Sequence, residues 1–123
     1  MAEEAVLEIV RRYADVVRHA LPVRAVVLFG SYANGTPRRD SDVDVAVELT
    51  SPPDNLRETT LALWRLRHQV DARIEPVLID SHDDPSGFAG EVKRHGRLVW
   101  PARGARRRLR PGRRAIVSRR APC

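Results

Sequence analysis

Two aspartates one residue apart are the first residues in this sequence whose type and spacing indicate chemistry. Asp42 and Asp44 flank Val43 at the start of a segment, residues 42–49, in which apolar and polar residues alternate. Because side chains alternate between the two faces of a strand, both carboxylates are expected on the face opposite the valines. Mg²⁺ prefers oxygen ligands such as carboxylates, so the pair predicts a divalent metal site.

A glycine and a serine precede this pair at a short distance along the chain. Gly30 and Ser31 directly follow an apolar run, and ten residues separate Ser31 from Asp42. Glycine lets the backbone pass close to phosphate oxygens, and the serine hydroxyl adds a hydrogen-bond donor. The turn therefore predicts binding of the phosphate groups of a nucleoside triphosphate.

Each motif has an ordinary structural explanation when it is taken alone. A single D-x-D pattern is more often the solvated face of a strand, and a Gly-Ser dipeptide is more often a simple turn. Together, at this spacing, the motifs favour chemistry on a nucleoside triphosphate. Two Mg²⁺ ions suit such chemistry, because they activate the attacking oxygen and neutralise the leaving oxygen.

The elements that must position these residues alternate between helix and strand. Apolar spacing predicts three long helices, a short helix after Gly30 and four strands. The expected helices cover residues 3–21, 55–70 and 84–96, and the expected strands cover residues 23–29, 42–49, 73–79 and 97–100. The order predicts an α/β (α+β) fold with a small mixed β-sheet of about four strands flanked by helices.

Two of these elements carry more detailed predictions. Pro76 lies in the third expected strand and cannot donate a ladder hydrogen bond, so that strand should lie at a sheet edge or contain a bulge. Asp84, followed by a proline, is typical of a helix N-cap, and Phe88 and Val92 are then expected to face inward.

Charge divides the 123 residues into two parts. Residues 1–100 contain thirteen basic and sixteen acidic residues, a net charge of −3, whereas residues 101–123 contain nine arginines and no acid, a net charge of +9. We therefore expect one domain over residues 1–100 and an arginine-rich, disordered tail over residues 101–123. The tail admits three roles: an electrostatic arm for nucleic acid, a contact for an acidic partner, or a solvated extension, which we favour because no aromatic residue interleaves the arginines.

The single cysteine, Cys123, excludes an intrachain disulfide and a cysteine-based metal site. No apolar run approaches the roughly 18 residues that a membrane span needs. These observations favour a soluble protein of the cytoplasm, with no membrane partner.

The sequence resembles the minimal nucleotidyltransferases of the DNA polymerase β-like superfamily, a group that includes the antitoxin partners of HEPN-domain toxins. The resemblance rests on LFGSYA at residues 28–33, SDVD at residues 41–44 and DARIEPV at residues 71–77. It implies a third carboxylate at Glu75, which would join Asp42 and Asp44 as a catalytic and metal-binding residue. Asp71 is the alternative to Glu75.

The resemblance also implies the donor and the partner. ATP would give AMP to an acceptor hydroxyl, most naturally a tyrosine of a HEPN toxin, and this chain would be the antitoxin. Two alternatives stay open: an antitoxin that acts by complexation without catalysis, and a nucleotidyltransferase for small molecules such as aminoglycosides.

Overall fold

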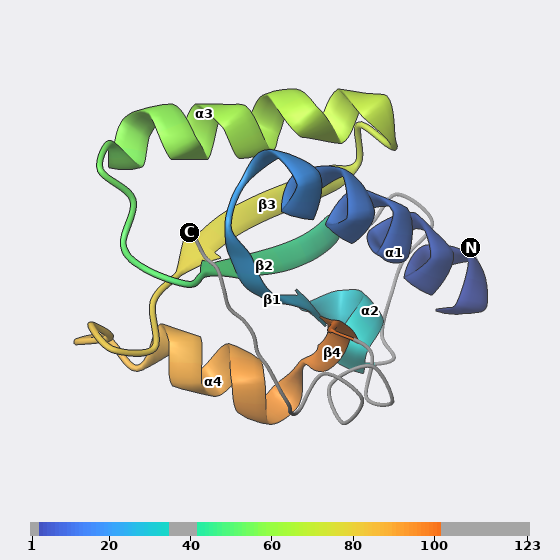
Figure 1. Ribbon diagram of the computed structural model, residues 1–123. Helices are drawn as coiled ribbons and strands as arrows, with labels where there is room; N and C mark the ends of the chain where they lie inside the picture. The colour runs from blue at the N-terminus through green and yellow to red at the C-terminus, as the bar shows by residue number, and fades with distance from the viewer. Residues whose placement is uncertain (1–2, 35–41, 102–123) are drawn as a thin grey trace, which may run out of the picture.

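The described part of the computed structural model, residues 3–34 and 42–101, forms a four-stranded sheet with helices on both faces (Figure 1). Every helix and strand expected from the sequence is present, so the predicted mixed sheet flanked by helices is confirmed. The elements are α1 (Glu3–Ala20), β1 (Val23–Phe29), α2 (Ser31–Asn34), β2 (Val43–Leu49), α3 (Leu56–Leu66), a 3₁₀ turn η1 (Arg67–Gln69), β3 (Ile74–Ile79), α4 (Phe88–His95) and β4 (Arg97–Trp100).

The strands lie in the order β3-β2-β1-β4. β1 pairs antiparallel with β2 and with β4, whereas β2 and β3 are parallel. A parallel pair needs a crossover connection, and α3 with η1 supplies it. β3 is an edge strand, as Pro76 predicts, since the proline there has a partner strand on one side only.

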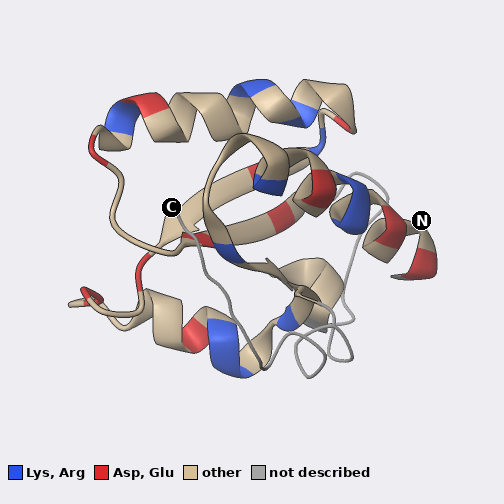
Figure 2. Cartoon of the chain, in the orientation of Figure 1, with Lys and Arg blue, Asp and Glu red and all other residues tan. Residues whose placement is uncertain are grey.

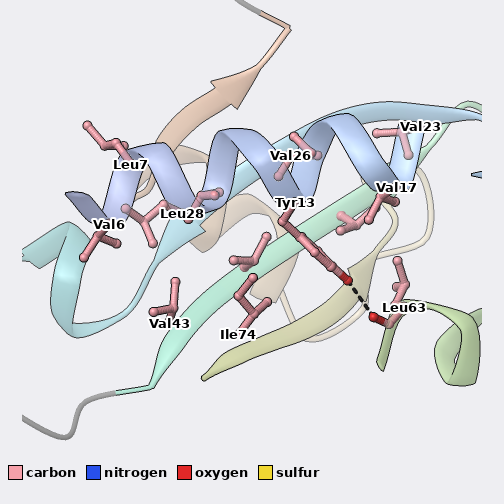
Figure 3. Close-up of a cluster of buried hydrophobic side chains, with 14 of the residues drawn as sticks. Val6, Leu7, Tyr13, Val17, Val23, Val26, Leu28, Val43, Leu63 and Ile74 are labelled. Carbon is pink, nitrogen blue, oxygen red and sulfur yellow. Dashed lines mark hydrogen bonds between the residues drawn. The ribbon is translucent and has the colours of Figure 1, made fainter. Parts of the chain in front are cut away.

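One face of the sheet is covered by α1 and α3, and the main hydrophobic core lies there. Val43, Val45 and Val47 all point into this core and are fully buried. The hydroxyl of Tyr13 on α1 donates a hydrogen bond of 2.8 Å to the carbonyl oxygen of Leu63 on α3 (Figure 3). The valine alternation thus places the intervening β2 residues on the opposite face of the sheet.

That opposite face is covered by α4, which is tied to β2 by a buried ion pair. Glu48 is only 2 % exposed, and Lys93 Nζ on α4 lies 2.6 Å from its Oε1. The backbone N–H of Ser81 donates to Glu48 Oε2 at 3.0 Å. Burial raises the pKa of Glu48, but the hydrogen bonds and the charge of Lys93 outweigh it, so the pKa lies below its ordinary value.

The start of α4 differs from the sequence prediction. The predicted N-cap, Asp84, does bind the first turn of the helix, because its two carboxylate oxygens accept from the backbone N–H groups of Ala89 and Gly90 at 3.0 Å each, but the N-cap residue itself is Gly87. However, the helix begins only at Phe88, after Gly87 in a left-handed conformation (φ +79°). Phe88 is thus the first residue of the helix and is 42 % exposed, so the expectation that it faces the core is wrong, whereas Val92 is buried as expected.

Residues 102–123 of the expected arginine-rich tail lie outside the described residues. Within the described part of the chain, no helix is both long and apolar enough to cross a bilayer.

Candidate active site

Two carboxylates from neighbouring strands lie side by side on the sheet face that carries α4, and the carboxylate of Asp42 lies next to them. Asp44 is the second residue of β2, and Glu75 is its partner in the parallel pairing with β3. Asp42 lies one residue before β2 begins, with its side chain exposed, whereas Asp44 and Glu75 are half-buried. Acidic positions on both strands are visible in Figure 2. The sequence predicted that Asp44 faces away from the valines. The pairing of β2 with β3, which the sequence did not specify, brings Glu75 beside it.

The pKa values of Asp44 and Glu75 are both raised at this site. Burial raises the pKa of Asp44, and the neighbouring charge of Asp42 raises it further. Burial is also the largest cause of the raised pKa of Glu75, followed by a hydrogen bond with Asp42 and the charges of Asp42 and Asp44. Negative charge is thus gathered where it is not fully compensated, which is the condition that favours binding of a cation.

The donor set fits Mg²⁺ that retains water and phosphate ligands. No group of three His, Cys, Asp or Glu side chains in residues 3–34 and 42–101 forms a ready-made metal cage. Mg²⁺ does not need one, because it is usually bound through one or two carboxylates together with substrate phosphates. Asp44 on β2 and Asp42, just before the strand begins, are two carboxylates that would suit such a site.

The Gly-Ser turn lies beside this pair because β1 is hydrogen-bonded to β2. Phe29, the last residue of β1, is the register partner of Asp44. Gly30 follows with φ +79°, a conformation that other residues rarely adopt, and a Cβ at this position would overlap Oδ2 of Asp44. Ser31, half-buried, begins α2. Glycine is therefore required here both by the backbone angle and by the close approach of the carboxylate.

Asp71, the alternative third carboxylate, is occupied elsewhere. Both of its oxygens accept hydrogen bonds from the Arg73 guanidinium, at 3.1 Å from Nε and 2.9 Å from Nη2. The hydrogen bond from Arg73 is the largest cause of its lowered pKa. Asp71 precedes β3, whereas Glu75 lies within it, directly opposite Asp44. The geometry therefore favours Glu75.

Arg67 is a residue near the site that the sequence did not reveal. Its Nη1 donates to the carbonyl oxygens of Ala72 and Ile74, at 2.6 and 3.1 Å. The pKa of Glu75 is raised by burial and by the other carboxylates, and the charge of Arg67 offsets part of this increase. The guanidinium lies 4.6 Å from the ring centroid of Trp64. Arg67 therefore holds the start of β3 in place and moderates the charge around Glu75. An isolated arginine at the end of an amphipathic helix gives no sequence signal for this role.

Two cavities open beside the carboxylates, and an aromatic pair separates them. One, of about 550 Å³, is lined by Asp44, Glu75 and Trp64; the other, of about 350 Å³, reaches Gly30. Phe29 and Phe88 line both and contact each other edge to face, with ring centroids 5.7 Å apart and planes at 82°. The site thus has one compartment at the glycine turn and another at Glu75.

Comparison with known proteins places this arrangement among nucleotide-dependent transferases. The model of the nucleotidyltransferase domain family matches residues 10–83, which include every predicted site residue. The protein adenylyltransferase MntA of Shewanella oneidensis is 31 % identical over 78 residues, which are 63 % of this chain and 54 % of that protein. The chain spans about half the length of the curated relatives it matches.

Two solved structures share the fold. A toxin-antitoxin crystallised with AMP-PNP has a TM-score of 0.59 at 24 % identity, over 77 % of this chain and 76 % of that chain. A complex of a tri-AMPylated HEPN toxin with an MNT antitoxin, from Shewanella oneidensis, has a TM-score of 0.55 at 19 % identity, over 86 % of this chain and 78 % of that chain.

Proposed function

This chain belongs to the nucleotidyltransferase domain family, and from that premise we propose that it transfers AMP from ATP to an acceptor hydroxyl. The observation that carries the proposal is the meeting of Asp44 and Glu75 on one sheet face, with Asp42 next to them, beside the turn at Gly30. Residues 1–100 would form the catalytic unit. The family match and the fold support this proposal, and the roles of individual residues below are part of it.

Asp42 and Asp44 are the residues that would hold Mg²⁺, with Glu75 completing the acidic site. Two bound ions would supply Lewis-acid activation of the acceptor oxygen and charge neutralisation on the departing pyrophosphate. Gly30 would allow the triphosphate to approach the backbone, and the Ser31 hydroxyl would donate a hydrogen bond to its β- or γ-phosphate oxygens.

Glu75 would take the proton of the acceptor. In the reaction, the acceptor oxygen forms a bond to the α-phosphorus while the bond from that phosphorus to the bridging oxygen of the β-phosphate breaks. The acceptor proton passes to Glu75, and pyrophosphate leaves with the bond electrons. The raised pKa of Glu75 favours this role, because a base is most effective when its pKa approaches the working pH.

The acceptor that we propose is a tyrosine of a HEPN-type toxin, with this chain as the antitoxin. Support comes from the relatives: one is named a protein adenylyltransferase, and one neighbouring structure holds an AMPylated HEPN toxin with its MNT antitoxin. The proposed protein acceptor distinguishes this chain from enzymes that modify small molecules.

The test is transfer of label from ATP labelled at the α-phosphate, with Mg²⁺, to a co-expressed HEPN-domain protein. We expect a mass gain of one AMP on that protein, lost in Asp42→Asn and Asp44→Asn. Undiminished labelling in both variants would refute the assignment. Toxin neutralisation that survived the double variant would instead favour complexation without catalysis, and labelling of an aminoglycoside without any partner protein would favour a small-molecule acceptor.

A further inference from the structure

The cavity at Glu75 continues into a larger one. The cavity of about 550 Å³ beside Asp44 and Glu75 shares Leu56, Leu78 and Phe88 with a second cavity of about 600 Å³. We call the combined depression the acceptor groove. It runs from the carboxylates, along the free edge of β3, to the loop that precedes α4. The two volumes together exceed what a single acceptor side chain needs.

The middle of the acceptor groove is apolar and exposed. Leu56, the first residue of α3, is 61 % exposed, and Phe88, the first residue of α4, is 42 % exposed. Two large apolar side chains at the starts of different helices thus face one depression. Neighbouring exposed apolar side chains that line one groove indicate a binding surface, whereas single exposed ones do not.

Both ends of the acceptor groove are acidic. Asp44 and Glu75 line one end, and Asp80, Asp83 and Asp84 line the other, where the loop before α4 carries acidic positions in Figure 2. Among the described residues, no Lys or Arg lines either cavity. Asp84 is used by the α4 cap, but Asp83 is exposed and makes no hydrogen bond or ion pair within the described part of the chain. Charge complementarity therefore selects a basic ligand at the distal end.

The donor nucleotide has a separate place. If Gly30 and Ser31 hold the triphosphate, the nucleotide lies in the compartment at the glycine turn, on the other side of the Phe29–Phe88 pair. The acceptor groove then remains for the other substrate, whose hydroxyl must reach Glu75.

On the basis of the proposed function, we propose that the acceptor groove binds an extended protein segment of defined pattern. Its hydroxyl-bearing residue would lie at Asp44 and Glu75, its apolar side chains between Leu56 and Phe88, and its Lys or Arg residues beside Asp83. An extended segment along the free edge of β3 can bind partly through its backbone and partly through alternate side chains.

Three fluorescent peptides test this with the full-length chain, Mg²⁺ and a nonhydrolysable ATP analogue. Each carries one tyrosine, then leucines, then a distal run of arginines, glutamines or glutamates. We expect the arginine peptide to bind most tightly. Asp83→Lys should weaken binding of the arginine peptide on the order of tenfold and should strengthen binding of the glutamate peptide, because it reverses the charge at the distal end of the groove. Leu56→Ala should weaken all three peptides by about tenfold, the value expected for a lost leucine contact.

The control is Leu61→Ala, since Leu61 is similarly exposed on the same helix but lines a different cavity. It should leave all three affinities unchanged. Binding of the ATP analogue, measured by calorimetry in each variant, should also be unchanged; this readout separates failure of the groove from failure of the proposed function.

Four outcomes would overturn the proposal. Equal binding of the three peptides, or no binding of any while the analogue still binds, would refute a basic protein segment as the ligand. Loss of analogue binding in Leu56→Ala would assign the groove to the nucleotide. A spin label on Cys123 that broadened the resonances of Leu56 and Asp83 in the free protein would assign it to the arginine-rich end of this chain.

Discussion

Glu75 on β3 is the register partner of Asp44 on β2, so two carboxylates more than thirty residues apart in sequence lie side by side on one sheet face. Parallel pairing brings the carboxylates of adjacent strands close together, and their like charges raise the pKa of Glu75 beyond the effect of burial. Such an arrangement is costly unless a cation or a proton occupies it. The following predictions depend on this relationship and on the elements that hold it.

Replacing Gly30 by alanine should damage the site more than it damages the fold. The new Cβ would strain the backbone and displace the Asp44 carboxylate, and a displacement of about 1 Å can cost on the order of 100-fold in rate. Gly87 offers a matched control, because it has the same φ of +79° but nothing within 4 Å of an added Cβ. Gly87→Ala should cost about 1 kcal/mol of unfolding free energy with activity retained. Equal activity loss in the two variants would contradict the proposed contact.

Glu75→Gln and Asp71→Asn should separate the two candidate carboxylates. Loss of a general base lowers kcat by about 10²- to 10⁴-fold, so we expect Glu75→Gln to fall in that range. Asp71→Asn removes only an ion pair with Arg73 and should lower stability by up to about 1 kcal/mol. Steady-state AMP transfer at neutral pH measures kcat of each variant, and urea unfolding measures its free energy of unfolding. The reverse ranking of the two rates would make Asp71 the third carboxylate.

Asp44→Asn should stabilise the protein while it abolishes activity. The pKa of Asp44 is raised, so its ionised form is disfavoured in the fold by burial and by Asp42. A neutral side chain of the same shape removes that cost, with a gain of a few tenths of a kcal/mol, about the size of other interactions between charges that solvent partly screens. Thermal unfolding without divalent ions measures the gain. High Mg²⁺ should stabilise the wild type but not Asp44→Asn, so the difference in stability between the two proteins should become smaller. A lower stability of Asp44→Asn without divalent ions would show that the ionised Asp44 carboxylate does not destabilise the fold.

Acid should weaken the attachment of α4 through Glu48. The pKa of Glu48 is lowered from its ordinary value of 4.5, so the ionised form stabilises the fold above that pH and the stabilisation is lost as the pH falls through the lower folded-state value. Lys93→Met leaves the buried carboxylate unpaired and should cost about 1–3 kcal/mol at neutral pH, less than for a fully buried pair because Lys93 is 38 % exposed.

Urea unfolding of wild type and Lys93→Met between pH 7 and pH 3 checks this assignment. The two stabilities should converge at the acid end, because protonation of Glu48 removes the charge that Lys93 compensates. A stability difference that stayed constant with pH would show that Lys93 contributes through packing alone.

The sequence by itself determined the elements of the site. Alternation in residues 42–49 placed Asp42 and Asp44 opposite the valines, because a strand has a side-chain period of two. The Gly-Ser turn and its spacing predicted a phosphate-binding loop, and Pro76 predicted an edge strand, because each of these signals depends on the conformation of its own few residues. The start of α4 was predicted less well, since Gly87 interrupts the helical conformation after the capping aspartate.

Only the tertiary structure places Glu75, and not Asp71, directly opposite Asp44, and only the tertiary structure brings Arg67 near Glu75 and two cavities next to each other. Strand register depends on pairing between distant segments, and a shift of one residue would have turned Glu75 to the other face of the sheet. Asp71 is held by Arg73, a neighbour only two residues away. Its position before β3, and not opposite Asp44, follows from where the crossover through α3 ends and β3 begins. Local periodicity specifies which side chains share a face, and the packed sheet specifies which of those side chains meet.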